Sequence, residues 1–270
     1  MSALVQDAGL SDREFTDFQR LIRDAAGISL APTKKALVAG RLAKRLKHHG
    51  LDRYADYYRL LHEQGDERQI AVDLLTTNET YFFREPKHFD FLRDRVLPQH
   101  PRERALRIWS AACSSGEEPY SVAMLLADHL GERPWEIFAS DISTRVLDKA
   151  RRGVYAMDGV RGMTTELMRK HCLKGTGTQE GWFAVDPALR RRVSFAQINL
   201  NTTLPDVGEF DVILLRNVLI YFEVQTKREV VARLQSKLRR GGHLFVGHSE
   251  SLSGLAGALE GVVPAVYRKP

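Results

Sequence analysis

Residues Arg107–Tyr120 read RIWSAACSSGEEPY, and this stretch decides the fold class. An apolar strand pattern runs into a turn of small residues, which two carboxylates and a proline follow. This order is typical of the nucleotide-binding loop of an α/β sheet. Proline suits the first helical position, because its missing N–H would be unpaired there. We therefore expect a helix that starts at Pro119 and leaves Glu118 in the loop, facing the site.

The charge of this turn indicates which ligand it binds. Glu117 and Glu118 would repel the pyrophosphate of a dinucleotide and favour a cationic group. Asp141 ends the next apolar run, WEIFASD, at the place where a carboxylate binds a ribose diol in such folds. A ribose together with a cation indicates S-adenosylmethionine. A second interpretation stays open, because these carboxylates can also stabilise helix starts without binding a ligand.

Composition favours a protein with a substantial core. The chain has 270 residues, with 40 Lys+Arg against 34 Asp+Glu and a net charge of +6. This excess is modest for a nucleic-acid binder. Cys113 and Cys172 are too few for a disulfide framework or a metal knuckle, and we expect no metal. No apolar run approaches the ~20 residues of a membrane span, and Met1–Phe15 lacks a secretory signal. We expect a cytoplasmic protein without direct membrane insertion.

Residues 1–75 are predicted to form an all-helical domain, because apolar residues recur at helical spacing after Ser11 and no strand pattern interrupts them. The run Lys34–Lys47, KKALVAGRLAKRLK, contains no acidic residue. It is either a solvated helix face or a docking face for an acidic helix. Its predicted buried stripe consists of Leu37, Val38, Leu42 and Leu46.

Residues 76–85 are predicted to link this domain to an α/β domain at 86–270, in which strands and helices alternate as in a parallel sheet. At about 158–192 the alternation fails, and glycine-marked turns predict a small antiparallel insertion. The predicted strands are Leu106–Ser110, Trp135–Ser140, Val193–Gln197, Phe210–Leu215, His243–Gly247 and Val262–Arg268.

Polar residues follow several of these strands, where ligands of open α/β sheets bind. The third strand is followed by Asn199, and the fourth by Arg216 and Asn217. Each residue alone could be a cap or a turn former. Their joint placement indicates a site.

The chain resembles the CheR family, the glutamate O-methyltransferases of methyl-accepting chemotaxis receptors, over nearly its whole length. The resemblance rests on TNETYFFRE, RIWSAACSSGEEPYS, FASDIS, RNVLIYF and GHSES in this order. It implies an α/β fold: a Rossmann-like S-adenosylmethionine-dependent methyltransferase sheet with an N-terminal all-helical domain and a small antiparallel β insertion. It also implies transfer of a methyl group to receptor glutamates, which forms glutamate methyl esters in chemotaxis adaptation and leaves S-adenosylhomocysteine.

The same resemblance implies residue roles. Arg84 would orient the substrate carboxylate, and Tyr221 would lie near the transferable methyl group; these two are the predicted catalytic residues. Glu118 would bind the amino group of the cofactor, and Asp141 its ribose. The predicted cofactor-binding residues are Asn78, Thr80, Arg84, Glu118, Asp141, Asn199, Leu200, Arg216 and Asn217.

The resemblance further implies partners. The helical cytoplasmic region of a chemoreceptor would meet the basic face at Lys34–Lys47, which would recruit the protein to membrane receptor arrays. Some family members hold a C-terminal pentapeptide tether of the receptor on the β insertion. A nucleic-acid methyltransferase is disfavoured, because the chain has no Asn-Pro-Pro-Tyr or Asp-Pro-Pro-Tyr element. A non-catalytic adapter that binds the cofactor stays open as an alternative.

Overall fold

The computed structural model describes residues 9–158 and 160–270. Residues 1–8 belong to the predicted helical domain and to the stretch Met1–Phe15 that was expected to lack a secretory signal; they lie outside the described residues. By its contacts the chain forms a helical unit, Met1–Thr77 with Tyr221–Glu223, and an α/β unit, Asn78–Ile220 with Val224–Pro270. No helix within the described ranges is long and apolar enough to cross a membrane.

From Gly9 onward, the described part of the helical unit contains four α-helices and a short 3-10 helix. Helix α1 begins with a capping box, in which the Ser11 hydroxyl accepts from the Glu14 N–H and the Glu14 carboxylate accepts from the Ser11 N–H. It ends at Gly27 in the left-handed conformation. The sequence therefore fixes both ends of α1 locally. The elements are α1 (Asp12–Ala26), η1 (Pro32–Lys34), α2 (Lys35–His48), α3 (Tyr54–Glu63) and α4 (Gly65–Leu75).

The predicted stripe of α2 is right at three positions and wrong at one. Val38, Leu42 and Leu46 are buried. Leu37 is 36% exposed. The reason is helical geometry: Leu37 lies in the row that continues four and eight residues later with Arg41 and Arg45, beside the buried row.

The main sheet of the α/β unit has seven strands in the order β6-β2-β1-β7-β8-β10-β9. Neighbouring strands from β6 to β8 are parallel to each other, whereas β10 is antiparallel to both β8 and β9. The carboxyl ends of β6, β2, β1 and β7 therefore meet at one edge. The strands are β1 (Leu106–Ser110), β2 (Trp135–Asp141), β6 (Val193–Gln197), β7 (Phe210–Leu215), β8 (Leu238–Val246), β9 (Glu260–Val263) and β10 (Val266–Arg268).

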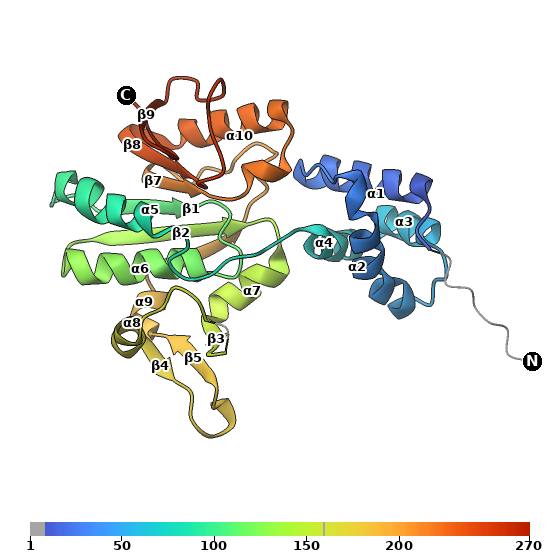
Figure 1. Ribbon diagram of the computed structural model, residues 1–270, viewed down its shortest axis with the longest axis horizontal. Coiled ribbons are helices and arrows are strands. Elements are labelled where there is room, and N and C mark those ends of the chain that lie inside the picture. The colour runs from blue at the N-terminus through green and yellow to red at the C-terminus, as the bar shows by residue number, and fades with distance from the viewer. Residues whose placement is uncertain (1–8, 159) are drawn as a thin grey trace, which may run out of the picture. The chain divides into compact units, whose positions relative to one another are not determined.

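Helices and short turns connect these strands (Figure 1). The Trp109 ring of β1 is fully buried, and its indole N–H donates to the Ser140 hydroxyl at 2.9 Å. The connecting elements are α5 (Pro86–Phe91), η2 (Leu92–Val96), η3 (Leu97–Gln99), α6 (Glu117–Leu130), α7 (Thr144–Arg152), η5 (Leu219–Tyr221) and α10 (Val224–Ser236).

Four predicted elements have other bounds in the structure. Strand β8 runs from Leu238 to Val246 and so starts five residues before the predicted His243, because Arg239, Arg240 and two glycines hide its start from the apolar pattern. Strand β2 continues to Asp141, one residue past the predicted Ser140.

Helix α6 starts at Glu117, two residues before Pro119, so Glu118 lies in its first turn and not in the loop. Proline is tolerated there because the first four N–H groups of a helix have no intrahelical acceptor. The predicted strand Val262–Arg268 is a hairpin of β9 and β10, which turns at Ala265 with φ 65°.

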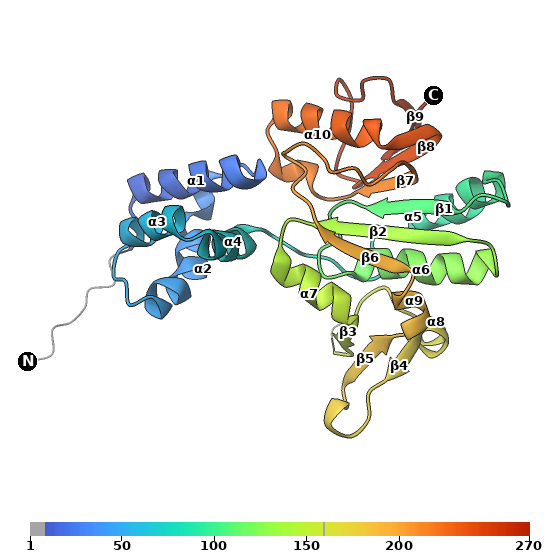
Figure 2. The same cartoon turned by 180° about the vertical axis from the view of Figure 1, so that it is seen from behind.

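The small antiparallel insertion has three strands in the order β3-β5-β4. Figures 1 and 2 place this sheet beyond helices α6 and α7, on the side away from α10. Its elements are β3 (Val154–Ala156), α8 (Thr165–His171), β4 (Cys172–Lys174), η4 (Gly177–Gln179), β5 (Trp182–Val185) and α9 (Pro187–Arg190).

Candidate active site

The polar residues that follow the parallel strands gather at the carboxyl edge of the sheet. Strand β1 pairs with β2 on one side and with β7 on the other, and β2 pairs with β6. The register therefore brings the regions of Glu118, Asp141, Asn199 and Arg216 to one edge. This is the place at which open α/β sheets bind ligands.

Asp141 connects three segments at this edge. Its carboxylate accepts from the Ser114 N–H at 2.9 Å and from the Ser143 N–H at 3.0 Å. Ser114 has a φ of 48°, and its hydroxyl donates to the Asn78 carbonyl at 2.8 Å. The structure thus brings the predicted residues Asn78 and Asp141 together through Ser114.

Glu118 accepts hydrogen bonds at both carboxylate oxygens. The Ser110 hydroxyl donates to Oε1 at 2.6 Å, and Arg216 Nη1 donates to Oε2 at 2.9 Å. Burial raises the pKa of Glu118 above its usual range, while the charge of Arg216 and the hydroxyl of Ser110 oppose the increase. Both bonded groups donate to the carboxylate oxygens, and an ammonium ligand is a donor of the same kind.

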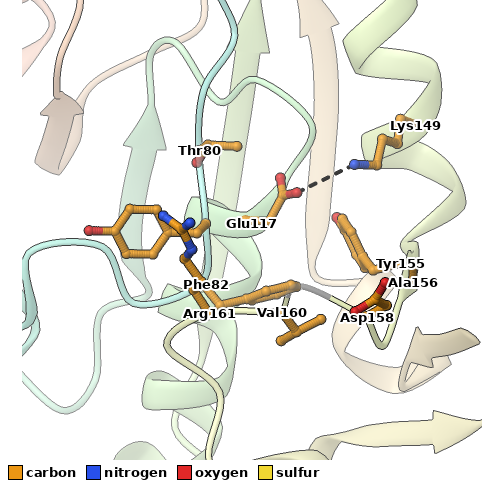
Figure 3. Close-up of a pocket in the computed structure, with 10 residues that line it drawn as sticks. Thr80, Phe82, Glu117, Lys149, Tyr155, Ala156, Asp158, Val160 and Arg161 are labelled. Atoms are coloured by element: carbon orange, nitrogen blue, oxygen red, sulfur yellow. Dashed lines mark ion pairs between the residues drawn. The ribbon is translucent and has the colours of Figure 1, made fainter.

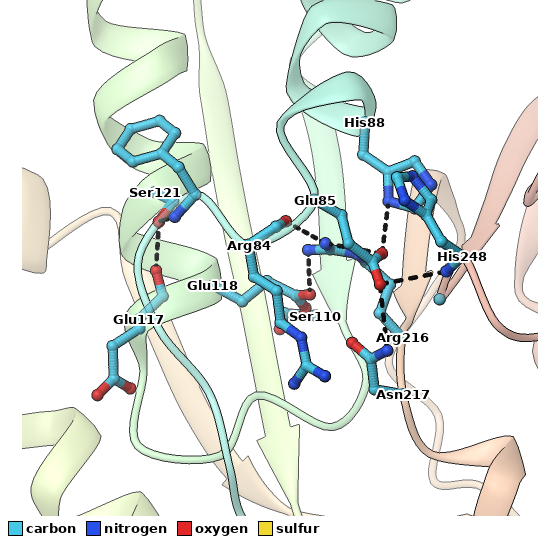
Figure 4. Close-up of polar contacts among 12 residues, drawn as sticks. Arg84, Glu85, His88, Ser110, Glu117, Glu118, Ser121, Arg216, Asn217 and His248 are labelled. Atoms are coloured by element: carbon cyan, nitrogen blue, oxygen red, sulfur yellow. Dashed lines mark hydrogen bonds and ion pairs between the residues drawn. The ribbon is translucent and has the colours of Figure 1, made fainter. Parts of the chain in front are cut away.

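Arg216 lies between two carboxylates (Figure 4). Its side chain is only 2% exposed. Nη2 lies 3.1 Å from Glu85 Oε2 and also donates to the Arg84 carbonyl. Its buried Nε makes no hydrogen bond to any residue that the structure describes. This N–H can therefore donate to a ligand.

Two carboxylates at this site were not foreseen from the sequence. Glu85 accepts from Arg216, from Asn217 Nδ2 at 3.2 Å and from the His248 N–H at 3.1 Å. Glu250 accepts the N–H groups of Gly247 and Asn217 at 2.6 and 2.9 Å. Both carboxylates lie in quoted motifs, TNETYFFRE and GHSES, but nothing in those motifs marks them.

Arg84 is partly buried and points away from the Glu85–Arg216 contact (Figure 4). Its Nη1 donates to the Glu79 carbonyl at 2.9 Å, and the guanidinium lies 5.8 Å from the centroid of the Tyr81 ring. The remaining N–H groups can pair with a substrate carboxylate.

A pocket of about 180 Å³ lies next to Thr80 (Figure 3). Its walls include Glu117 and Lys149, which form an ion pair at 3.5 Å, and Tyr155. Of the predicted cofactor residues, only Thr80 lines this pocket.

The remaining predicted residues lie on other segments. The Asn199 side chain accepts from the Asn201 N–H at 2.9 Å, and the Leu200 carbonyl accepts from Arg233 Nη1 at 2.9 Å. Tyr221 is grouped with the helical unit, where its carbonyl accepts from the Ser29 N–H at 2.8 Å. Its place near a transferable methyl group stays a prediction.

Glu85, His88 and His248 offer three potential metal-ligand atoms within 4.8 Å of one another. His88 is buried, and burial lowers its pKa to about 3, so its imidazole is neutral. However, the Arg216 guanidinium already lies 3.1 Å from Glu85 Oε2. A metal cation at this carboxylate would be repelled by that charge, so we do not assign a metal site.

The donor and acceptor groups at this edge fit S-adenosylmethionine. Asp141 supplies a carboxylate for a ribose diol, as in other open α/β sheets. Glu85 and Glu118 together outnumber the single charge of Arg216, which favours a ligand with a cationic end.

Comparisons with known proteins agree with this fit. The model of the CheR methyltransferase all-alpha domain matches residues 13–76, and that of the CheR methyltransferase SAM binding domain matches residues 78–265. The chain is 43% identical over 261 residues to the chemotaxis protein methyltransferase of Escherichia coli (strain K12), covering 93% of this chain and 89% of that protein. It is 41% identical over 265 residues to chemotaxis protein methyltransferase 2 of Pseudomonas aeruginosa, covering 97% and 95%.

Proposed function

The chain belongs to the CheR methyltransferase family, and from this premise we propose that it methylates glutamate side chains of chemoreceptor cytoplasmic helices. S-adenosylmethionine is the methyl donor. The products would be glutamate methyl esters, which serve chemotaxis adaptation, and S-adenosylhomocysteine. The observation that carries the proposal is the convergence of Glu118, Asp141 and Arg216 at one sheet edge.

In this proposal the cofactor lies across the carboxyl edge of the sheet. Glu118 binds its amino group, and Asp141 binds its ribose. The other cofactor contacts come from Asn78, Thr80, Arg84, Asn199, Leu200, Arg216 and Asn217. The linker at 76–85 contributes Asn78, Thr80 and Arg84, and the domain at 86–270 contributes the rest. The support is chemical, since the polar and charged residues among them have the groups that their roles require.

Methyl transfer to a carboxylate depends more on the alignment of the reacting groups than on acid–base catalysis. A glutamate carboxylate has a reference pKa of ~4.3 and is already a nucleophile near neutral pH. A carboxylate oxygen forms a bond to the methyl carbon while the sulfur–carbon bond breaks and its electrons stay on sulfur. The task of the protein is to orient the carboxylate and to exclude water from it.

Arg84 is the residue that we propose for this orientation. Its guanidinium is held at one edge by the Glu79 carbonyl, which leaves other N–H groups for a paired contact with the substrate carboxylate. Tyr221 is proposed to lie beside the methyl group. The alternative for Arg84 is a purely structural role in the linker.

The basic helix α2 is proposed to dock on the receptor, with residues 1–75 as the docking domain. Not every cation of the run Lys34–Lys47 is available. Arg45 is bound by Glu67, and Lys35 lies 2.7 Å from Asp12. The exposed cations without an ion pair to a described residue are Lys34, Lys44 and Lys47. These three lysines would face the acidic receptor helix and hold the cytoplasmic protein at membrane receptor arrays.

The small β sheet is proposed to bind a receptor tether as an additional strand. Its edge strand β4 exposes Leu173, and its neighbour β5 exposes Trp182. An extended peptide could add to such an edge through main-chain hydrogen bonds. Failure of a receptor C-terminal pentapeptide to bind at millimolar concentration would exclude this tether.

The test of the proposed function is transfer of labelled methyl from S-adenosylmethionine to a chemoreceptor cytoplasmic fragment, followed by alkali treatment. Label that alkali releases as volatile methanol would establish carboxyl methyl esters. Cofactor binding without transfer to any of several receptor fragments would instead support the non-catalytic adapter. Transfer to a nucleic acid would instead support a nucleic-acid methyltransferase.

A further inference from the structure

Glu85 has a backbone conformation that side-chain-bearing residues rarely adopt. Its φ and ψ are 59° and 69°, in the left-handed region. Phe83, two residues earlier, also has a positive φ, of 51°. Such positions persist where the surrounding contacts determine them, and an observed outlier is a reason to ask what it positions.

The contacts of the Glu85 carboxylate come from distant parts of the α/β unit. Oε2 lies 3.1 Å from Arg216 Nη2, and Oε1 accepts from Asn217 Nδ2 and from the His248 N–H. Arg216 and Asn217 follow β7, while His248 follows β8. The left-handed turn thus aims one linker carboxylate at the ends of two neighbouring strands (Figure 4).

This contact divides the charge of Arg216 between two carboxylates. Nη1 is bonded to Glu118 and Nη2 to Glu85. Neutral His88, whose Nδ1 lies 3.4 Å from Glu85 Oε2, adds no positive charge. Two carboxylates therefore share one buried guanidinium, so the ionised cluster carries more negative than positive charge.

Resting on the proposed function, we propose that Glu85 is a positioning residue that prevents Arg216 from neutralising Glu118, so that Glu118 can bind the ammonium group of the methionine moiety. Without the Glu85 charge, the guanidinium would pair with Glu118 alone. The amino-group site would then be a closed ion pair with no net charge. A ligand ammonium would be bound more weakly, while a ligand without an amino group would be unaffected.

The test compares two ligands by calorimetry. S-adenosylhomocysteine carries the amino-acid moiety, and 5′-methylthioadenosine lacks it. Glu85→Gln should lower the affinity for S-adenosylhomocysteine about tenfold and change the affinity for 5′-methylthioadenosine by less than about twofold. In a Glu118→Gln background, adding Glu85→Gln should cause little further loss, because the group that it acts through is gone. Glu132→Gln, an exposed site before β2 at the opposite sheet edge, is the matched control.

Equal weakening of both ligands by Glu85→Gln would overturn the proposal, since it would mean general damage to the site. The proposal would also be overturned if Glu85→Gln lowered the affinity for S-adenosylhomocysteine as much in the Glu118→Gln background as in the wild type. If Glu85→Gln does not fold, Glu85→Asp permits the same comparison: selective loss of S-adenosylhomocysteine supports the proposal, and equal loss of both ligands overturns it. Wild-type protein that binds neither ligand would refute the proposed function itself, a distinct result.

Discussion

Glu67→Gln in the helical unit should lower the free energy of unfolding, by an amount that shrinks in acid. Glu67 is a carboxylate with only 4% exposure. Arg45 donates to both of its oxygens, at 2.8 and 2.5 Å, and the Tyr57 hydroxyl donates at 2.6 Å. His49 Nε2 lies 3.1 Å away. A buried charge held by so many donors stabilises the fold only while it is ionised.

The magnitude follows from the pKa of this carboxyl. Burial alone would raise the pKa of Glu67, but the hydrogen bonds from Arg45, Tyr57 and His49 lower it from 4.5 to about 2. At about 1.4 kcal/mol per pKa unit, the ionised carboxylate contributes about 3 kcal/mol to stability. Because the pKa is lower in the folded state than in the unfolded state, this contribution is complete above about pH 5 and is lost as the pH falls toward about 2.

The assay is urea unfolding of wild type and Glu67→Gln near pH 7 and near pH 3. Circular dichroism reports on both units, whereas the three tryptophans lie in the α/β unit, so fluorescence separates its transition. The difference in unfolding free energy should shrink by about 2 kcal/mol between the two pH values. Glu63→Gln, an exposed site on α3, should show little difference at either pH. A Glu67→Gln deficit that is the same at both pH values would refute the reasoning.

Three further predictions concern function and chemistry. Arg84→Ala should slow methyl transfer about tenfold or more while cofactor affinity falls less; transfer at wild-type speed would refute its orienting role. Lys44→Glu with Lys47→Glu should raise the KM for a receptor fragment several-fold at low salt and have less effect at high salt; a salt-independent effect would contradict electrostatic docking. Burial raises the pKa of the Cys113 thiol well above its usual range, so this thiol should react with a chromogenic disulfide only after urea unfolding; fast reaction of the native protein at this position would contradict its burial.

The sequence predicts the sheet well where burial and local signals agree. Strands β1, β6 and β7 have the predicted bounds, because each is an apolar run between turn residues. The start of α6 was wrong because proline fits anywhere in the first helical turn and cannot fix its first residue. Leu37 was wrong because a lone apolar residue beside a buried stripe gives no periodicity signal of its own.

The site residues likewise fall into those that local sequence signals predict and those that depend on distant contacts. Glu118, Asp141 and Arg216 could be proposed because the carboxyl ends of parallel strands converge, whatever the remaining details of the chain. Glu85 could not, because its role depends on a left-handed backbone and on partners 131 and 163 residues away in the sequence. Local pattern cannot predict such contacts.

The burial of Arg216 itself argues that this cluster serves a ligand more than stability. Removing a guanidinium and two carboxylates from water costs more than their mutual attraction usually returns, and apolar side chains of similar volume often stabilise a core better. A cluster kept for stability alone would also satisfy every donor, yet the buried Nε of Arg216 has no acceptor among the described residues. In the proposed complex the carboxylate of S-adenosylmethionine would accept from Nε, and its ammonium group would bind Glu118. The unsatisfied donor and the excess negative charge therefore have one explanation in the same ligand.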